Sequence, residues 1–95
     1  MKHYGLIGKS LSHSFSPAFF KAYFKEHQIE ASYELIPIED ISSIESVLSS
    51  AYKGLNVTIP YKEAIIPFLD EIDDEAKAIG AVNTVVFRNG KRVGY

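Results

Sequence analysis

Residues 54–62 read Gly-Leu-Asn-Val-Thr-Ile-Pro-Tyr-Lys, an apolar run that a proline interrupts. A short apolar run bounded by glycine and proline is typical of a buried strand, so we expect a strand over residues 54–59. Pro60 keeps the residue before it extended and suits the beginning of a helix, which we expect at Tyr61. The stretch therefore predicts a strand that leads through a defined turn into a helix.

The same alternation of strand and helix extends outward from this stretch in both directions. We expect strands over residues 4–8, 32–37, 54–59, 82–88 and 91–93, and helices over residues 17–28, 41–51, 61–69 and 70–79. Strands that alternate with helices form a largely parallel sheet, and Asn89-Gly90 strongly indicates a two-residue hairpin turn. The sequence therefore predicts an α/β domain of three layers, with a mostly parallel twisted sheet flanked by helices and a C-terminal β-hairpin.

Composition narrows the class of partner. The 95 residues fit one domain, the net charge is −2 and cysteine is absent. Mixed charges without a basic patch do not favour nucleic acid or a membrane surface, so we expect a small-molecule partner and a cytoplasmic location. The three histidines, His3, His13 and His27, lack ligand spacing, so we expect no metal. The sequence carries no signal of oligomeric state.

Ser14 and Ser16 follow the first expected strand, where a parallel sheet commonly binds its ligand. Their hydroxyls are neutral donors beside an expected helix N-terminus, a position that favours an anion such as a carboxylate. An equally weighted alternative is structural, with Ser16 capping the helix that begins at Pro17 and Ser14 forming a turn.

Thr58 and Lys62 follow the third expected strand. A cation in the first turn of a helix lies near the positive end of the helix dipole, which favours release of a proton and makes Lys62 a candidate for proton transfer. Periodicity alone favours the alternative of a solvated lysine balanced by Glu63.

Asn83 enters the fourth expected strand just after Gly80, which ends a helix. Its amide can both donate to and accept from a substrate hydroxyl, although a turn asparagine bonded to its own backbone is as good an interpretation. The sequence contains no Gly-x-Gly-x-x-Gly fingerprint, so we expect no dinucleotide on this chain.

Taken together, three segments resemble the signatures of the shikimate dehydrogenases. They are Gly8-x-x-Leu11-x-His13-Ser14-x-Ser16-Pro17, Asn56-Val57-Thr58-Ile59-Pro60-Tyr61-Lys62 and Gly80-Ala81-Val82-Asn83-Thr84. Their order and spacing agree with the family across essentially the whole chain.

The resemblance implies an NADP-dependent oxidoreductase that reversibly reduces 3-dehydroshikimate to shikimate in the chorismate pathway of aromatic amino acid biosynthesis. It implies that Ser14 and Ser16 hold the substrate carboxylate, and that Thr58 and Asn83 bind ring hydroxyls. Lys62 would be the catalytic residue, orienting the reacting oxygen and assisting proton transfer.

Departures from the family pattern are Lys9, Ser10 and Tyr61, and none removes an expected substrate contact. The family continues past the position of Tyr95 into an aspartate that partners the lysine, and then into a Rossmann domain that binds NADP. We therefore expect this chain alone to bind substrate without turnover. A quinate/shikimate dehydrogenase domain and a stand-alone binding module are the alternatives.

Overall fold

A six-stranded mixed sheet forms the frame of the chain, in the strand order β2-β1-β3-β5-β6-β4. The computed structural model describes residues 2–9 and 17–95, without the side chains of residues 17–21. The strands are β1 (Lys2–Gly8), β2 (Ala31–Pro37), β3 (Gly54–Val57), β4 (Glu71–Ile72), β5 (Thr84–Arg88) and β6 (Lys91–Gly94). The helices are α1 (Pro17–Glu26), α2 (Ile44–Leu48), α3 (Tyr61–Ala64) and α4 (Asp74–Ile79), with 3₁₀ turns η1 (Ile41–Ser43) and η2 (Ile66–Phe68).

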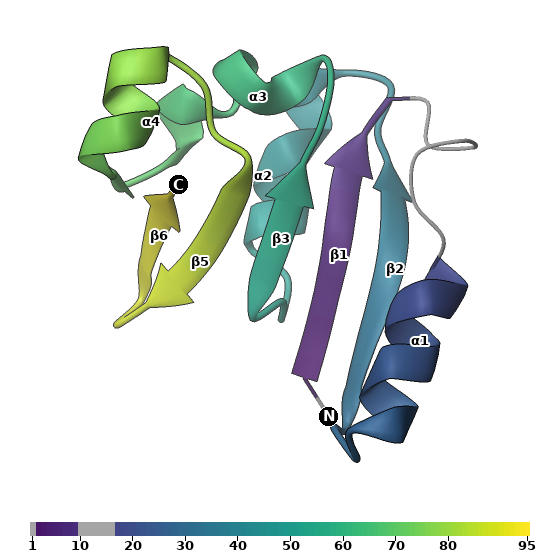
Figure 1. The fold of residues 1–95 in the computed structure, drawn as a ribbon. Coiled ribbons are helices and arrows are strands. Elements are labelled where there is room, and N and C mark those ends of the chain that lie inside the picture. Colours follow the sequence, from purple (N-terminus) through teal and green to yellow (C-terminus); the bar gives the residue numbers. More distant parts are fainter. Residues whose placement is uncertain (1, 10–16) are drawn as a thin grey trace.

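The first three strands in the chain build the parallel half of the sheet. β1 lies in the middle, paired in parallel with β2 and with β3. α1 and α2 cover opposite faces of this half (Figure 1), and the ring of Phe24 on α1 lies 6.2 Å from that of Tyr4 on β1. The predicted alternation of strand and helix, with helices on both faces, is confirmed.

β5 and β6 form the predicted hairpin, and both turn residues have positive φ, 51° at Asn89 and 77° at Gly90. Positive φ at both central positions is the geometry of the type I′ turn that suits hairpins. β5 also pairs antiparallel with β3, so the sheet is mixed rather than purely parallel. Because β5 runs opposite to β3, the first residues of β5 lie at the edge where β3 ends.

All four expected helices are shorter in the structure: the helix expected over 17–28 ends at Glu26, and the one expected over 41–51 is η1 followed by α2, which ends at Leu48. The two others are shortened for reasons that the structure shows. α3 ends at Ala64 and gives way to η2, because Pro67 has no N–H to continue the helical ladder. α4 begins at Asp74 rather than at Asp70, because the N–H groups of Asp70 and Asp73 donate to β6 carbonyls instead. The intervening residues form β4, which pairs with β6.

The core lies on the α2 side of the sheet. Its largest fully buried side chains come from strands, helices and the segment before β5: Ile7, Ile44, Leu55, Ile65, Val82 and Val85. At the rim, the guanidinium of Arg92 on β6 binds Glu45 on α2 with an N–O distance of 2.7 Å.

Within the described ranges, no helix has the length and apolar character needed to cross a membrane.

Replacing Ile7 by alanine tests this core. The side chain is 0% exposed in the middle strand, so Ile7→Ala should lower the free energy of unfolding by about 2–5 kcal/mol. Urea denaturation followed by circular dichroism measures the change. The matched control is Ile79→Ala, whose parent side chain is 70% exposed and should change stability by no more than about 0.5 kcal/mol. Equal losses in the two variants would contradict the assigned core.

Gly80 ends α4 with φ of 81°, and its N–H donates to the carbonyl of Ala76. A Cβ at this position would meet no atom within 4 Å, so any penalty for alanine comes from the backbone alone. Gly80→Ala should therefore cost about 1 kcal/mol, whereas Gly80→Asn should cost less because asparagine tolerates this conformation. Thermal unfolding of the two variants measures the difference, and an asparagine variant less stable than the alanine variant would refute the explanation.

Candidate functional site

The ends of β1 and β3 and the beginning of β5 meet at one edge of the sheet, next to α3 and α4 (Figure 1). Backbone hydrogen bonds join them: the N–H of Thr58 donates to Ile7 O at 2.9 Å, and the N–H of Val57 donates to Asn83 O at 2.7 Å. The segments that carry Thr58 and Asn83 are thereby held together by main-chain contacts.

Lys62 lies in α3, the helix that follows β3 at this junction. Its carbonyl accepts a hydrogen bond from the N–H of Val82 at 2.9 Å, so the lysine backbone is fixed one residue away from Asn83. The half-buried side chain of Lys62 belongs to a helix of four residues. The macrodipole of a single turn is small, so the helix-dipole reason for selecting Lys62 carries little weight, and its position at the junction is the stronger reason.

Tyr61 anchors α3 to the core. The ring is 4% exposed, and the hydroxyl donates to the carbonyl of Ile38 just after β2. Burial of the hydroxyl, together with the charges of Asp40 and Glu39, raises the pKa of Tyr61. The tyrosine that departs from the family pattern thus makes an additional backbone contact beside Lys62.

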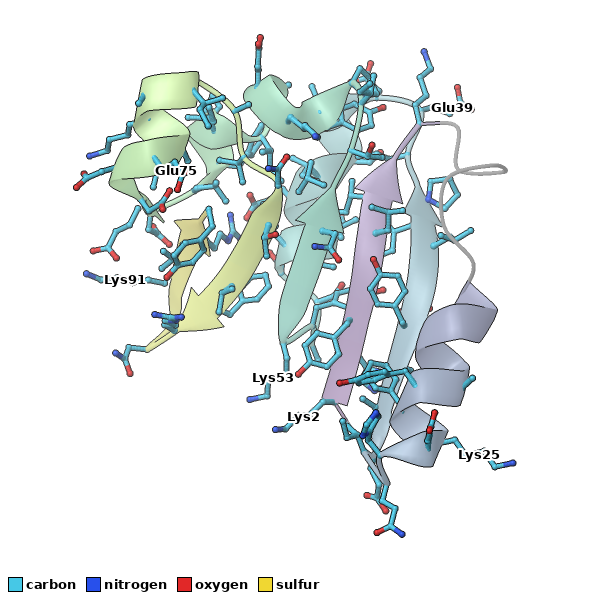
Figure 2. All side chains as sticks on the ribbon, viewed as in Figure 1. Lys2, Lys25, Glu39, Lys53, Glu75 and Lys91 are labelled. Atoms are coloured by element: carbon cyan, nitrogen blue, oxygen red, sulfur yellow. The ribbon has the colours of Figure 1, made fainter. Side chains whose placement is uncertain are left out.

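A cavity of 520 Å³ opens at this edge. Its lining includes Lys62 and Asn83, so the structure brings together two of the residues selected from the sequence. The other lining residues come from α4 and its flanks and from the end of β6: Asp73, Glu75, Ala76, Ile79, Ala81 and Tyr95. Figure 2 shows Glu75 on α4, far from Lys53 and Lys2 at the opposite edge of the sheet.

Asn83 is held by neighbouring segments rather than by its own turn. Its N–H donates to Tyr95 O at 2.7 Å, and its carbonyl accepts from the N–H of Val57. Both backbone groups therefore have partners on other segments, and the side chain is exposed at the cavity. The role of this amide in binding a hydroxyl stays a prediction.

Thr58 is half-buried in the turn between β3 and α3, where its carbonyl accepts from the N–H of Tyr61 at 3.0 Å. It lies at the junction, although it is not among the residues that line the 520 Å³ cavity. Ser14 and Ser16 lie outside the described residues, so their role in binding a carboxylate stays a prediction.

The sequence motifs did not identify three residues that line the cavity. They are Tyr95 and two acidic residues, Asp73 and Glu75, which form the acidic wall of the cavity. Asp73 caps α4 by accepting from the N–H of Ala76 at 2.9 Å, and Glu75 follows in the first turn. The position of Tyr95 could have been found by counting residues outward from the Asn89-Gly90 turn along both strands of the hairpin. The two-residue turn pairs Arg88 with Lys91, and continuing that register brings Tyr95 opposite Thr84, beside Asn83.

A second hollow of 480 Å³ lies on the α1 face of the sheet. Aromatic and aliphatic side chains dominate its lining, among them Tyr4, Phe24, Ile29 and Val86. The cavity at the sheet edge is the more polar of the two, because a lysine, an amide and two carboxylates are among its lining groups.

In residues 2–9 and 17–95, no group of three or more His, Asp or Glu side chains is arranged to hold a metal ion. The described turn from β3 to α3 contains Ile59 and Pro60 rather than the glycines that let a backbone approach a pyrophosphate.

Known proteins match the chain over most of its length. The family model of the shikimate dehydrogenase substrate binding domain matches residues 6–85. An NADP-dependent shikimate dehydrogenase of Clostridium beijerinckii is 48% identical and is matched by 100% of this chain. The chain spans 36% of that relative, so the relative is much longer.

Solved structures agree in fold. Shikimate dehydrogenase 1 of Peptoclostridium difficile is 45% identical, with a TM-score of 0.86 over 100% of this chain and 36% of that chain. The Thermus thermophilus enzyme in complex with shikimate is 34% identical, with a TM-score of 0.89 over 99% of this chain and 37% of that chain.

A quinate dehydrogenase of Corynebacterium glutamicum in complex with NAD is also 34% identical, with a TM-score of 0.84 over 99% of this chain and 36% of that chain. Since the family model covers most of the sequence, the chain belongs to the family of shikimate dehydrogenase substrate binding domains.

Proposed function

We propose that the chain binds shikimate and 3-dehydroshikimate as the substrate-binding domain of an NADP-dependent shikimate dehydrogenase. One observation carries the proposal: Lys62 and Asn83 come from different elements yet line one cavity at the sheet edge, and the N–H of Val82 ties their backbones together. A lysine and an amide at one cavity are donors suited to the oxygens of a hydroxylated ring.

The proposed roles follow from this placement. Lys62 orients the reacting oxygen and exchanges its proton, while Asn83 and Thr58 bind ring hydroxyls. Asp73 and Glu75 give the α4 wall of the cavity a negative charge that disfavours a carboxylate there. The substrate carboxylate would therefore point away from α4, and we assign its binding to Ser14 and Ser16.

NADP is assigned to a second domain outside these 95 residues. The greater length of the relatives supports this assignment, as does the proline-containing turn after β3. In this proposal the lone chain binds substrate without turnover, and the complete enzyme acts in chorismate and aromatic amino acid biosynthesis in the cytoplasm.

A quinate/shikimate dehydrogenase is the second candidate, because the quinate dehydrogenase of Corynebacterium glutamicum has the same fold at 34% identity. Quinate and shikimate are both hydroxylated ring acids, so the same polar groups could hold either one. Titration of both compounds into the chain separates the two candidates: binding of shikimate alone supports the first, and comparable binding of quinate supports the second.

Titration of shikimate into the ¹⁵N-labelled chain, followed by amide shifts, tests the proposed function. We expect saturable shifts at Thr58, Lys62 and Asn83. Lys62→Met should weaken binding by about tenfold and Asn83→Ala by about fivefold, because each removes a hydrogen-bonding group from the cavity.

The matched control is Lys77→Met, because Lys77 is an exposed lysine of α4 outside the cavity lining. It should bind shikimate like the unmodified chain. Saturable shifts confined to the 480 Å³ hollow, or no saturable shift at all, would refute the assigned site.

A further inference from the structure

The side chain of Arg92 on β6 joins three segments on the α2 side of the sheet. Its Nη1 donates to Glu45 Oε2 on α2 at 2.9 Å, and its Nη2 donates to Glu45 Oε1 at 2.7 Å. Nη1 also donates to the carbonyl of Phe68 in η2 at 3.1 Å, and Nη2 to Ser49 Oγ, just after α2, at 3.3 Å. Together these four residues form what we call the Arg92 clasp.

The geometry of the clasp sets it apart from an ordinary surface ion pair. Exposed pairs contribute little on average, but two parallel N–H···O bonds between a guanidinium and a carboxylate are stronger and directional. The side chain of Arg92 is 21% exposed, and Ser49 Oγ donates to Glu45 Oε1 at 3.3 Å, which helps to orient the carboxylate. Hydrogen bonding to Arg92 lowers the pKa of Glu45, so the pair is charged at neutral pH.

The backbone of Arg92 is held as well. Its N–H donates to Asp70 Oδ2 at 2.7 Å, and its carbonyl accepts from the N–H of Asp70 at 2.9 Å. Arg92 therefore connects β6 to the segment before β4 through its main chain, and to α2 and η2 through its side chain.

The end of β6, two residues further on, contacts both sides of the candidate site. Gly94 lies so close to Val82 that a Cβ at Gly94 would be 3.0 Å from a methyl carbon of Val82. The carbonyl of Gly94 accepts from the N–H of Asp73 at 2.9 Å. The carbonyl of Tyr95 accepts from the N–H of Asn83 at 2.7 Å. A shift of β6 would therefore displace Asn83 and the beginning of α4 together.

We propose that Arg92 is a positioning residue, whose clasp fixes β6 against α2 and η2 so that Asn83 and the beginning of α4 are correctly placed at the 520 Å³ cavity. The functional part of this inference rests on the proposed function of that cavity. Arg92 is not among the residues that line the cavity, so it acts through the position of β6.

Amide hydrogen exchange without ligand tests the structural part. Arg92→Met keeps an unbranched apolar stem and removes the guanidinium, and it should accelerate exchange at Asp73 and Asn83 about fivefold, because their acceptors on β6 are held less firmly. Arg92→Lys should accelerate it less, since it keeps the charge but not the fork geometry. The amide of Ile38, which donates to Gly8 at the end of β1, is the internal reference and should keep its rate.

Titration of shikimate tests the functional part. Arg92→Met should raise Kd about fivefold and Glu45→Gln about threefold, because a less ordered cavity makes binding more costly. The double variant should bind no more weakly than Arg92→Met, because both changes break the same pair.

The matched control is Lys91→Met, which removes a cation from the neighbouring position of β6. Lys91 pairs with Glu71 at 3.6 Å, and both side chains are more than half exposed. This variant should leave the exchange rates and Kd unchanged.

The two readouts separate the inference from the function on which it rests. If the unmodified chain binds shikimate and Arg92→Met binds as tightly, the positioning role is refuted. If the unmodified chain does not bind, the proposed function fails, and exchange at Asp73 and Asn83 still decides whether the clasp fixes β6. Equal acceleration at Ile38 would show a general loss of stability and would also overturn the inference.

Discussion

The backbone hydrogen bond from the N–H of Val57 to the carbonyl of Asn83 is the contact on which the site depends. It joins the end of β3 to the residue before β5, and it continues the antiparallel pairing of these two strands. In a purely parallel sheet the first residues of β5 would lie at the opposite edge, far from Lys62. Because β5 runs in this direction, Lys62 and Asn83, which belong to two motifs far apart in the sequence, line the same cavity.

Buried apolar residues hold the segments that meet at this junction. Tyr61 and Ile65 seat the short α3 turn on buried strands, and Val82, which is 0% exposed, lies between Lys62 and Asn83. Polar side chains at the edge are thus carried by backbone that is packed against apolar residues. Such an arrangement holds functional groups in place before a ligand arrives, which reduces the ordering cost of binding.

Local signals in the sequence predicted much of the fold, because each depends on neighbouring residues. Asn89-Gly90 identified the hairpin, and the apolar run before Pro60 identified the third strand. The antiparallel pairing of β5 with β3 and the two-residue strand β4 depend on contacts between distant segments, which no local pattern encodes. Within the site, the structure places Lys62 and Asn83 at one cavity, and the hairpin register brings Tyr95 beside Asn83. The position of Asp73 and Glu75 at this cavity depends on how α4 packs, which no local pattern encodes. The roles of all five selected residues stay predictions: Ser14, Ser16, Thr58, Lys62 and Asn83.

A crystal structure of the chain grown with shikimate tests the central claim most directly, because the two hollows of similar volume make different predictions. We expect electron density for shikimate at the sheet edge, with a ring oxygen within hydrogen-bonding distance of Lys62 Nζ and of the Asn83 amide. Density for shikimate on the α1 face beside Tyr4 and Val86, with the edge cavity lacking ligand, would contradict the account.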